Sequence, residues 1–128
     1  MALTSDILRG YTDTILLRCL SEGDSYGYRM VKQIAQRSGG MLELKEPTLY
    51  TAFRRLSQDG LIDSYWGDEQ SGARRRYYRL TDAGRRRLSE EQLTWIETRR
   101  TLDSLLLDSS APIRLHLNQQ IIEGGSQV

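Results

Sequence analysis

Apolar residues near the start of the chain recur at steps of three and four, the spacing that places side chains on one face of a helix. This face consists of Ile7, Leu8, Tyr11, Ile15 and Leu16. We therefore expect one amphipathic helix over residues 4–20, with Thr4 or Ser5 as its cap and a turn at Gly23 after it. Cys19 falls near the apolar side, where we expect it to pack in the core.

The same spacing continues after Asp24 and Ser25, which are both good N-cap residues. It predicts a second helix whose apolar face consists of Tyr28, Val31, Ile34 and Ala35. Gly39 and Gly40 end this helix, because glycine adopts the positive φ angles of a helix C-terminus. The short alternating run over residues 41–44 then predicts a strand with a single bridge.

A third helix is predicted from Pro47 to Asp59, since proline is favoured in the first turn and Gly60 has the terminating position. At about 100° per residue, Leu49, Phe53 and Leu56 share one face, with Ala52 on its flank. The opposite face carries guanidinium, hydroxyl and amide groups and has no acid before Asp59. Its members are Pro47, Thr48, Tyr50, Thr51, Arg54, Arg55 and Gln58.

Two alternating segments follow, over residues 61–66 and 75–80, joined by a polar stretch that glycines bracket. This pattern predicts a long β-hairpin. On its returning strand, either Tyr77 or Tyr78 faces the core, because neighbouring strand residues point to opposite faces.

The last long helix is predicted over residues 81–107, with Thr81 as its N-cap. Leu88, Trp95 and Leu102 are seven residues apart and Leu106 follows four residues later, which gives a partial heptad seam. A helix of this length exceeds what so small a domain covers, so we expect it to form a dimer. After a break at residues 108–112, a short amphipathic helix is expected, formed by Ile113, Leu117 and Ile121, and then a disordered tail.

The order helix, helix, short strand, helix and hairpin is typical of the winged helix-turn-helix, whose third helix enters the major groove of DNA. We therefore predict a mainly α fold with a β-hairpin wing (α+β). The expected organisation is a winged-helix DNA-binding domain over 1–80, a long dimerisation helix over 81–107, and a short C-terminal helix and tail over 108–128. The length of 128 residues fits one such domain.

The net charge is only +1, but the positive charge is concentrated in one segment. Residues 72–87 contain seven arginines and one acid, so the rest of the chain is acidic on balance. Arginine presents a planar fork of donors that suits phosphates and guanine edges. A GC-rich genome would explain why arginine outnumbers lysine, but not why the arginines cluster. The clustering favours a nucleic-acid partner.

Three motifs together resemble the PadR family of bacterial transcriptional regulators. They are Ser25-Tyr26-Gly27-Tyr28, then Pro47-Thr48-Leu49-Tyr50 with Arg55-Leu56 and Asp59-Gly60-Leu61-Ile62, and then residues 76–84, Arg-Tyr-Tyr-Arg-Leu-Thr-Asp-Ala-Gly. The resemblance covers about residues 5–107 and implies a winged-helix homodimer that binds a palindromic operator, usually as a repressor. Many members are released by small molecules such as phenolic acids or hydrophobic drugs. The chain is similar to the short members, with an added segment from Asp108 to Val128.

The resemblance also implies roles for individual residues. The implied DNA-binding residues are Tyr26, Thr48, Tyr50, Thr51, Arg54, Arg55, Arg74, Arg75 and Arg76. The seam of Leu88, Trp95, Leu102 and Leu106 becomes the expected dimer interface. Trp95 lies about where drug-binding relatives carry a tryptophan at the dimer centre, so it is a candidate for stacking on a small aromatic effector; packing in the dimer core is the favoured alternative.

Several of these residues have a second interpretation. Arg79 could pair with Asp63 across the hairpin instead of touching DNA. Arg85, Arg86 and Arg87 form either a solvated helix face or phosphate contacts. Trp66 is better explained by packing in the wing than by ligand binding.

Other classes of function are less consistent with the sequence. His116 is the only histidine, no Cys/His spacing suits zinc, and neither a phosphate-binding glycine loop nor a serine nucleophile motif occurs. We therefore expect no enzyme activity, no metal and no cofactor. A protein–protein adaptor would not need the acid-free helix face. With a single cysteine, no long apolar run and no signal sequence, we expect a bacterial protein of the cytoplasm, associated with the nucleoid when bound to DNA.

Overall fold

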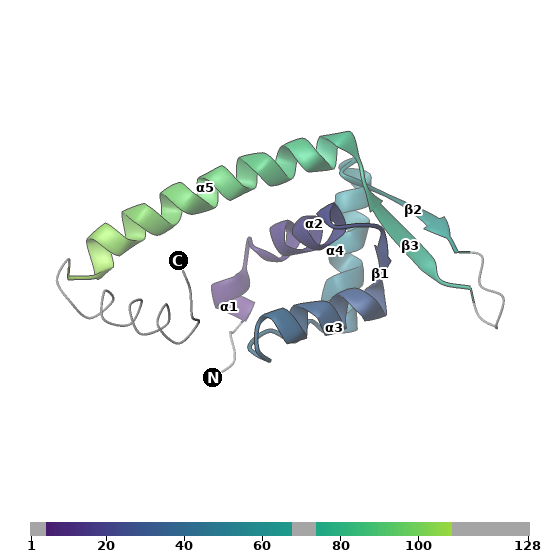
Figure 1. The fold of residues 1–128 in the computed structure, drawn as a ribbon, viewed down its shortest axis with the longest axis horizontal. Helices are drawn as coiled ribbons and strands as arrows, with labels where there is room; N and C mark the ends of the chain where they lie inside the picture. Colours follow the sequence, from purple (N-terminus) through teal and green to yellow (C-terminus); the bar gives the residue numbers. More distant parts are fainter. Residues whose placement is uncertain (1–4, 68–73, 109–128) are drawn as a thin grey trace, which may run out of the picture. The chain divides into compact units, whose positions relative to one another are not determined.

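A computed structural model describes residues 5–67 and 74–108 of the chain. The contacts divide the chain into two compact units, residues 1–92 and 93–128. The elements are α1 (Ser5–Leu8), α2 (Thr12–Ser21), β1 (Ser25–Tyr26), α3 (Gly27–Arg37), α4 (Glu46–Gln58), β2 (Ile62–Trp66), β3 (Arg76–Leu80) and α5 (Asp82–Leu106). The first unit is a winged helix-turn-helix, with the hairpin β2–β3 beside the helices α2, α3 and α4 (Figure 1).

The single helix predicted over residues 4–20 is wrong, because the structure has two helices there. Gly10 adopts a φ of 90°, in the left-handed region, and interrupts the helical path between α1 and α2. The amide of Tyr11 bonds the carbonyl of Leu8 at 2.8 Å and closes the turn. The apolar spacing continues across this break, which is why the pattern gave one helix.

The predicted start of the second helix and the predicted strand at residues 41–44 are also wrong. Neither Asp24 nor Ser25 caps the helix, because Tyr26 holds the N-cap position of α3, without a side-chain hydrogen bond. Ser25 and Tyr26 instead form β1, which pairs antiparallel with Tyr78 and Tyr77 of β3. The sheet order is therefore β1-β3-β2. Residues 42–45 have no regular structure, although Leu42 and Leu44 are buried. The alternating pattern thus reflects the burial of Leu42 and Leu44, but this segment pairs with no strand.

The apolar face predicted for the second helix is partly wrong. Ile34 is buried as expected, but Tyr28 is 66% exposed, and the other buried positions of α3 are Gly27 and Met30. At about 100° per residue, Tyr28 lies about 160° from Met30 and about 120° from Ile34 around the helix, so its side chain leaves the buried face and points to solvent.

The core face predicted for α4 is confirmed. Leu49, Ala52, Phe53 and Leu56 are all buried, and Gly60 follows the helix with a φ of 73°. The ring of Phe53 stacks on that of Tyr78 with centroids 3.9 Å apart, so α4 is fixed against the sheet. Burial of one such side chain contributes about 1.5–3 kcal/mol to folding.

The hairpin is confirmed, with Ile62 opposite Leu80 and Tyr65 opposite Tyr77. Tyr78 is the tyrosine that faces the core. Arg79 pairs with Asp63 at 3.4 Å across the two strands, as the second interpretation of Arg79 proposed.

The start of α5 is joined closely to the winged-helix unit. The amide of Gly84 donates to the Thr81 hydroxyl at 3.0 Å, so Thr81 caps the helix as predicted. The Thr14 hydroxyl donates to Glu91 at 2.9 Å, and Leu88 packs in the core with α2 and α3. The helix predicted for Ile113 to Ile121 and the tail lie outside the described residues. No helix in the described ranges is long and apolar enough to cross a membrane.

Candidate nucleic-acid interface

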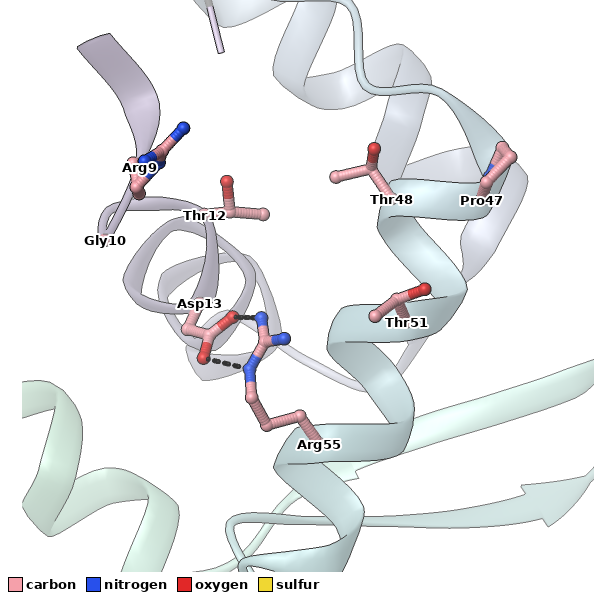
Figure 2. A pocket seen from close by; sticks show the side chains of 8 residues that line it. All are labelled: Arg9, Gly10, Thr12, Asp13, Pro47, Thr48, Thr51 and Arg55. Atoms are coloured by element: carbon pink, nitrogen blue, oxygen red, sulfur yellow. Dashed lines mark hydrogen bonds and ion pairs between the residues drawn. The ribbon is translucent and has the colours of Figure 1, made fainter. Parts of the chain in front are cut away.

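The two neighbouring arginines of α4 have different surroundings. Arg55 points toward the start of α2, where its Nε donates to Asp13 Oδ2 at 2.9 Å and a second guanidinium nitrogen donates to the other carboxylate oxygen (Figure 2). These bonds raise the pKa of Arg55 above its usual value. Within the described residues, Arg54 has no hydrogen bond or ion pair. The fold therefore engages Arg55 in an ion pair and leaves Arg54 without a partner among the described residues.

Arg54 faces a cleft of about 340 Å³ between α4 and the hairpin. The cleft contains two guanidinium groups, hydroxyls and an amide, and no carboxylate lines it. Its lining residues are Tyr50, Phe53, Arg54, Ser57, Gln58, Ser64, Arg76 and Tyr78. An acid-free cleft with two guanidinium groups favours a ligand that is negatively charged and rich in hydrogen-bond acceptors, as the surface of DNA is.

Tyr50 occupies its place on α4 because the neighbouring residue of α3 is a glycine. A Cβ on Gly27 would lie 2.8 Å from the Tyr50 hydroxyl oxygen and 3.1 Å from Leu49 Cδ2. The Tyr50 ring also packs edge-on against Phe53 at 5.7 Å, yet the side chain remains 44% exposed. Gly27 thus lets the first turn of α3 approach α4 and fixes the position of an exposed tyrosine.

The wing arginines, which are adjacent in sequence, bind to different aromatic rings. The guanidinium carbons of Arg74 and Arg76 lie 5.4 and 5.5 Å from the centre of the Trp66 ring, and Arg76 also donates twice to the Ser64 hydroxyl. Arg75 instead lies 4.6 Å over the ring of Tyr26. Trp66 is therefore an exposed support for two arginines, which agrees with packing in the wing.

Tyr26 lies in β1 and not in a helix as expected, half-buried between charged and aromatic groups. Its ring meets Tyr77 edge-on at 5.4 Å and lies 4.7 Å from the Arg29 guanidinium. On the same side of the sheet, the Tyr65 hydroxyl donates to Asp24 at 2.6 Å, and this bond raises the pKa of Tyr65. Tyr26 therefore packs against β3 and against two arginines within the fold, in addition to any contact with DNA.

Tyr28 and Lys32 are two exposed residues that the sequence analysis did not assign to the interface. The Lys32 ammonium lies 5.2 Å over the Tyr28 ring, on the first turns of α3. The spacing of four residues between an aromatic ring and a cation was the available signal. It was missed because Tyr28 was placed in the core.

Thr48 and Thr51 face a second cavity, of about 580 Å³, between the start of α2 and α4. Figure 2 shows Thr12 and Arg9 across the gap from the two threonines, with the pair Asp13–Arg55 at one end. The polar face of α4 thus has two sides, one toward the wing and one toward α2.

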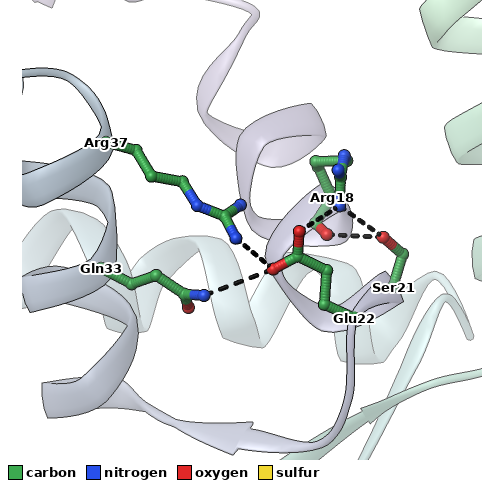
Figure 3. A network of polar contacts seen from close by, with 5 residues as sticks. All are labelled: Arg18, Ser21, Glu22, Gln33 and Arg37. Atoms are coloured by element: carbon green, nitrogen blue, oxygen red, sulfur yellow. Dashed lines mark hydrogen bonds and ion pairs between the residues drawn. The ribbon is translucent and has the colours of Figure 1, made fainter.

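A further polar network contains one arginine of α2 and one of α3. Glu22, at the end of α2, accepts from Arg18 at 2.8 Å, from Arg37 at 2.5 Å and from Gln33 at 3.3 Å (Figure 3). These bonds lower the pKa of Glu22. The network joins α2 to α3, so Arg18 and Arg37 serve the fold.

The expected dimer seam is divided between the two units. Leu88 is 6% exposed and lies in the core of its own chain, which leaves little of it for a partner. In the second unit, large apolar side chains are exposed on α5 and at the residue directly after it. They are Leu93, Trp95, Leu102, Leu105, Leu106 and Leu107. Of the residues expected in the dimer seam, Trp95, Leu102 and Leu106 are thus exposed and Leu88 is not.

The described residues contain no group of three His, Cys, Asp or Glu side chains that could hold a metal ion.

Three consecutive arginines, Arg85, Arg86 and Arg87, are exposed on the first turns of α5. The Arg87 guanidinium lies 4.0 Å from the Glu90 carboxylate.

Sequence comparison with known proteins supports the resemblance to the PadR family. The sequence profile of the PadR-like family of transcriptional regulators matches residues 16–90. A protein of Lysinibacillus sphaericus, itself named only as uncharacterized, is 41% identical over 99 residues, which are 77% of this chain and 91% of that protein.

Solved structures agree as well. A transcriptional regulator from Clostridium thermocellum is 42% identical, with a TM-score of 0.74 over 80% of this chain and 99% of the other. A PadR family regulator from Clostridium difficile is 37% identical, with a TM-score of 0.69 over 76% and 99%. The winged helix, the motifs and these relatives together establish that the chain belongs to the PadR-like family of transcriptional regulators.

Proposed function

We propose that the protein is a sequence-specific repressor that binds a palindromic operator as a homodimer. The observation that carries the proposal is Arg54, which faces an acid-free cleft beside the wing. In a winged helix, α4 lies in the major groove and the hairpin lies against the neighbouring backbone. Arg54 can then reach guanine O6 and N7, with Thr48, Tyr50 and Thr51 as further contacts to bases.

The wing arginines Arg74, Arg75 and Arg76 supply affinity more than specificity. Their guanidinium groups lie over aromatic rings, which hold them extended at little further cost in entropy. Contacts with phosphates carry no sequence information, but they set the register of the protein on the duplex. Tyr26 and Arg55 belong to the same interface as contacts to the backbone.

Dimerisation uses the exposed apolar residues of α5, with Trp95, Leu102 and Leu106 at the seam. A two-fold dimer places two α4 helices about one DNA turn, roughly 34–36 Å, apart, which explains a palindromic operator. Two Trp95 rings near the axis would also accept a flat aromatic effector, whose binding releases the DNA. The protein then acts at the nucleoid in the bacterial cytoplasm.

The test is a titration of DNA measured by fluorescence anisotropy at two salt concentrations. One duplex carries the palindrome upstream of the protein's own gene, and the other has a shuffled sequence. We expect tighter binding to the palindrome and a steep loss of affinity with salt for both duplexes. Binding to neither duplex would refute the proposal and favour a protein–protein adaptor.

A further inference from the structure

The ion pair between Asp13 and Arg55 places a carboxylate against the polar face of α4. The two residues are 42 positions apart and come from different helices, so the contact is made only by the fold. Asp13 is the acid that lines the cavity beside Thr48 and Thr51, and its two oxygens both accept from the Arg55 guanidinium. A DNA-binding helix therefore carries an arginine that is already neutralised in the free protein.

A carboxylate and a phosphate present similar acceptors to an arginine. Both accept two parallel N–H bonds from the guanidinium fork. The Arg55 and Asp13 side chains are 49% and 36% exposed, so water screens the pair and its contribution is small. The exchange of one anion for the other at Arg55 is thus nearly balanced in energy.

The surroundings of the pair suit a phosphate. The cavity of about 580 Å³ is open to solvent and is lined by the hydroxyls of Thr12, Thr48 and Thr51, which can donate to anionic oxygens. In Figure 2 these hydroxyls lie on both sides of the gap, with Arg55 at its end. The group that enters would therefore meet donors from α2 and from α4 together.

We propose that this cavity is a binding site for a backbone phosphate of DNA. In the free protein, the Asp13 carboxylate takes the place of that phosphate and pairs with Arg55. The proposal rests on the proposed function, because it assumes that α4 faces DNA. When Arg55 binds a phosphate, its ion pair with Asp13 breaks. The Asp13 carboxylate then remains near the phosphate and repels it. Asp13 therefore weakens binding to every duplex, whatever its sequence. This reduces occupancy of the many non-specific sites in a genome.

The substitution Asp13→Asn tests this, because it keeps the shape of the side chain and removes its charge. With a duplex of mixed sequence, we expect binding to tighten by about twofold to fivefold, the range of a screened ion pair. The slope of log affinity against log salt should steepen by about 0.9, one phosphate contact. Asp13→Ser is a second variant, and thermal unfolding of both checks that they fold.

A matched control is Glu43→Gln, which changes the net charge equally at an exposed acid that lies outside α2 and α4 and does not line the cavity. A second control is Asp13→Asn in an Arg55→Ala background, where no gain and no steeper slope are expected. An equal gain in Glu43→Gln, or a gain that persists without Arg55, would overturn the proposal, since Asp13 would then act only by general repulsion. No change in Asp13→Asn would also overturn it. If the unmodified protein binds no duplex at all, the proposed function itself fails.

Discussion

Gly84 is the position where one added methyl group has the most severe consequence. A Cβ at this residue would lie 2.1 Å from the carbonyl oxygen of Leu61 and 2.6 Å from Leu80 Cδ1. The Leu61 carbonyl is backbone and also accepts the Thr81 amide at 3.1 Å, so it cannot move without loss of that bond. The substitution Gly84→Ala must therefore shift the start of α5 away from the sheet.

Two effects with opposite signs decide the result. Alanine in a helix is favoured over glycine by about 1 kcal/mol. Overpacking costs about 1–3 kcal/mol or more, and a lost backbone hydrogen bond adds about 1 kcal/mol. We expect the clash to dominate and the free energy of unfolding to fall by about 2 kcal/mol. For a domain of this size that lowers the Tm by roughly 8–16 °C.

Thermal and urea unfolding followed by circular dichroism measure this change. Ser89→Ala is the control, because Ser89 is exposed on the same helix and reports helix propensity alone. We expect Ser89→Ala to be neutral or slightly stabilising. A Gly84→Ala variant as stable as the unmodified protein would show that the start of α5 does not pack as closely as described.

Four further predictions concern binding and assembly. Arg54→Ala should weaken binding to the operator by about 1–3 kcal/mol and to shuffled DNA by less, as measured by anisotropy; an equal loss on both would make Arg54 a phosphate contact. Replacement of Arg74, Arg75 and Arg76 by alanine should weaken binding to all duplexes alike and reduce the salt slope by about 0.9 per lost phosphate contact, and an unchanged slope would contradict this. Leu102→Glu should give monomers by light scattering, because a charge in an apolar seam is desolvated without a partner; a dimeric variant would place the interface elsewhere. In a Trp66→Phe background, planar aromatic compounds should quench Trp95 fluorescence saturably, and Trp95→Ala should lose the heat of binding of the same compounds in titration calorimetry while the dimer persists; no quenching across a broad panel would leave Trp95 as interface core.

Features that depend on neighbours in the sequence could be read from it. The buried face of α4 follows from the spacing of Leu49, Phe53 and Leu56, and the cap of α5 follows from Thr81. The hairpin follows from two alternating segments around a polar stretch. These signals are local because a helix face or a cap is formed by residues within a few positions of one another.

Features that depend on distant partners required the tertiary structure. β1 exists because Ser25 and Tyr26 find β3, more than fifty residues later, and no local pattern marks so short a strand. The same holds for Arg55, which the sequence placed among the DNA contacts and the fold pairs with Asp13. The sequence determined which side chains α4 presents. The tertiary structure decided which of them are already engaged, because charges pair with whatever the fold brings within a few ångströms.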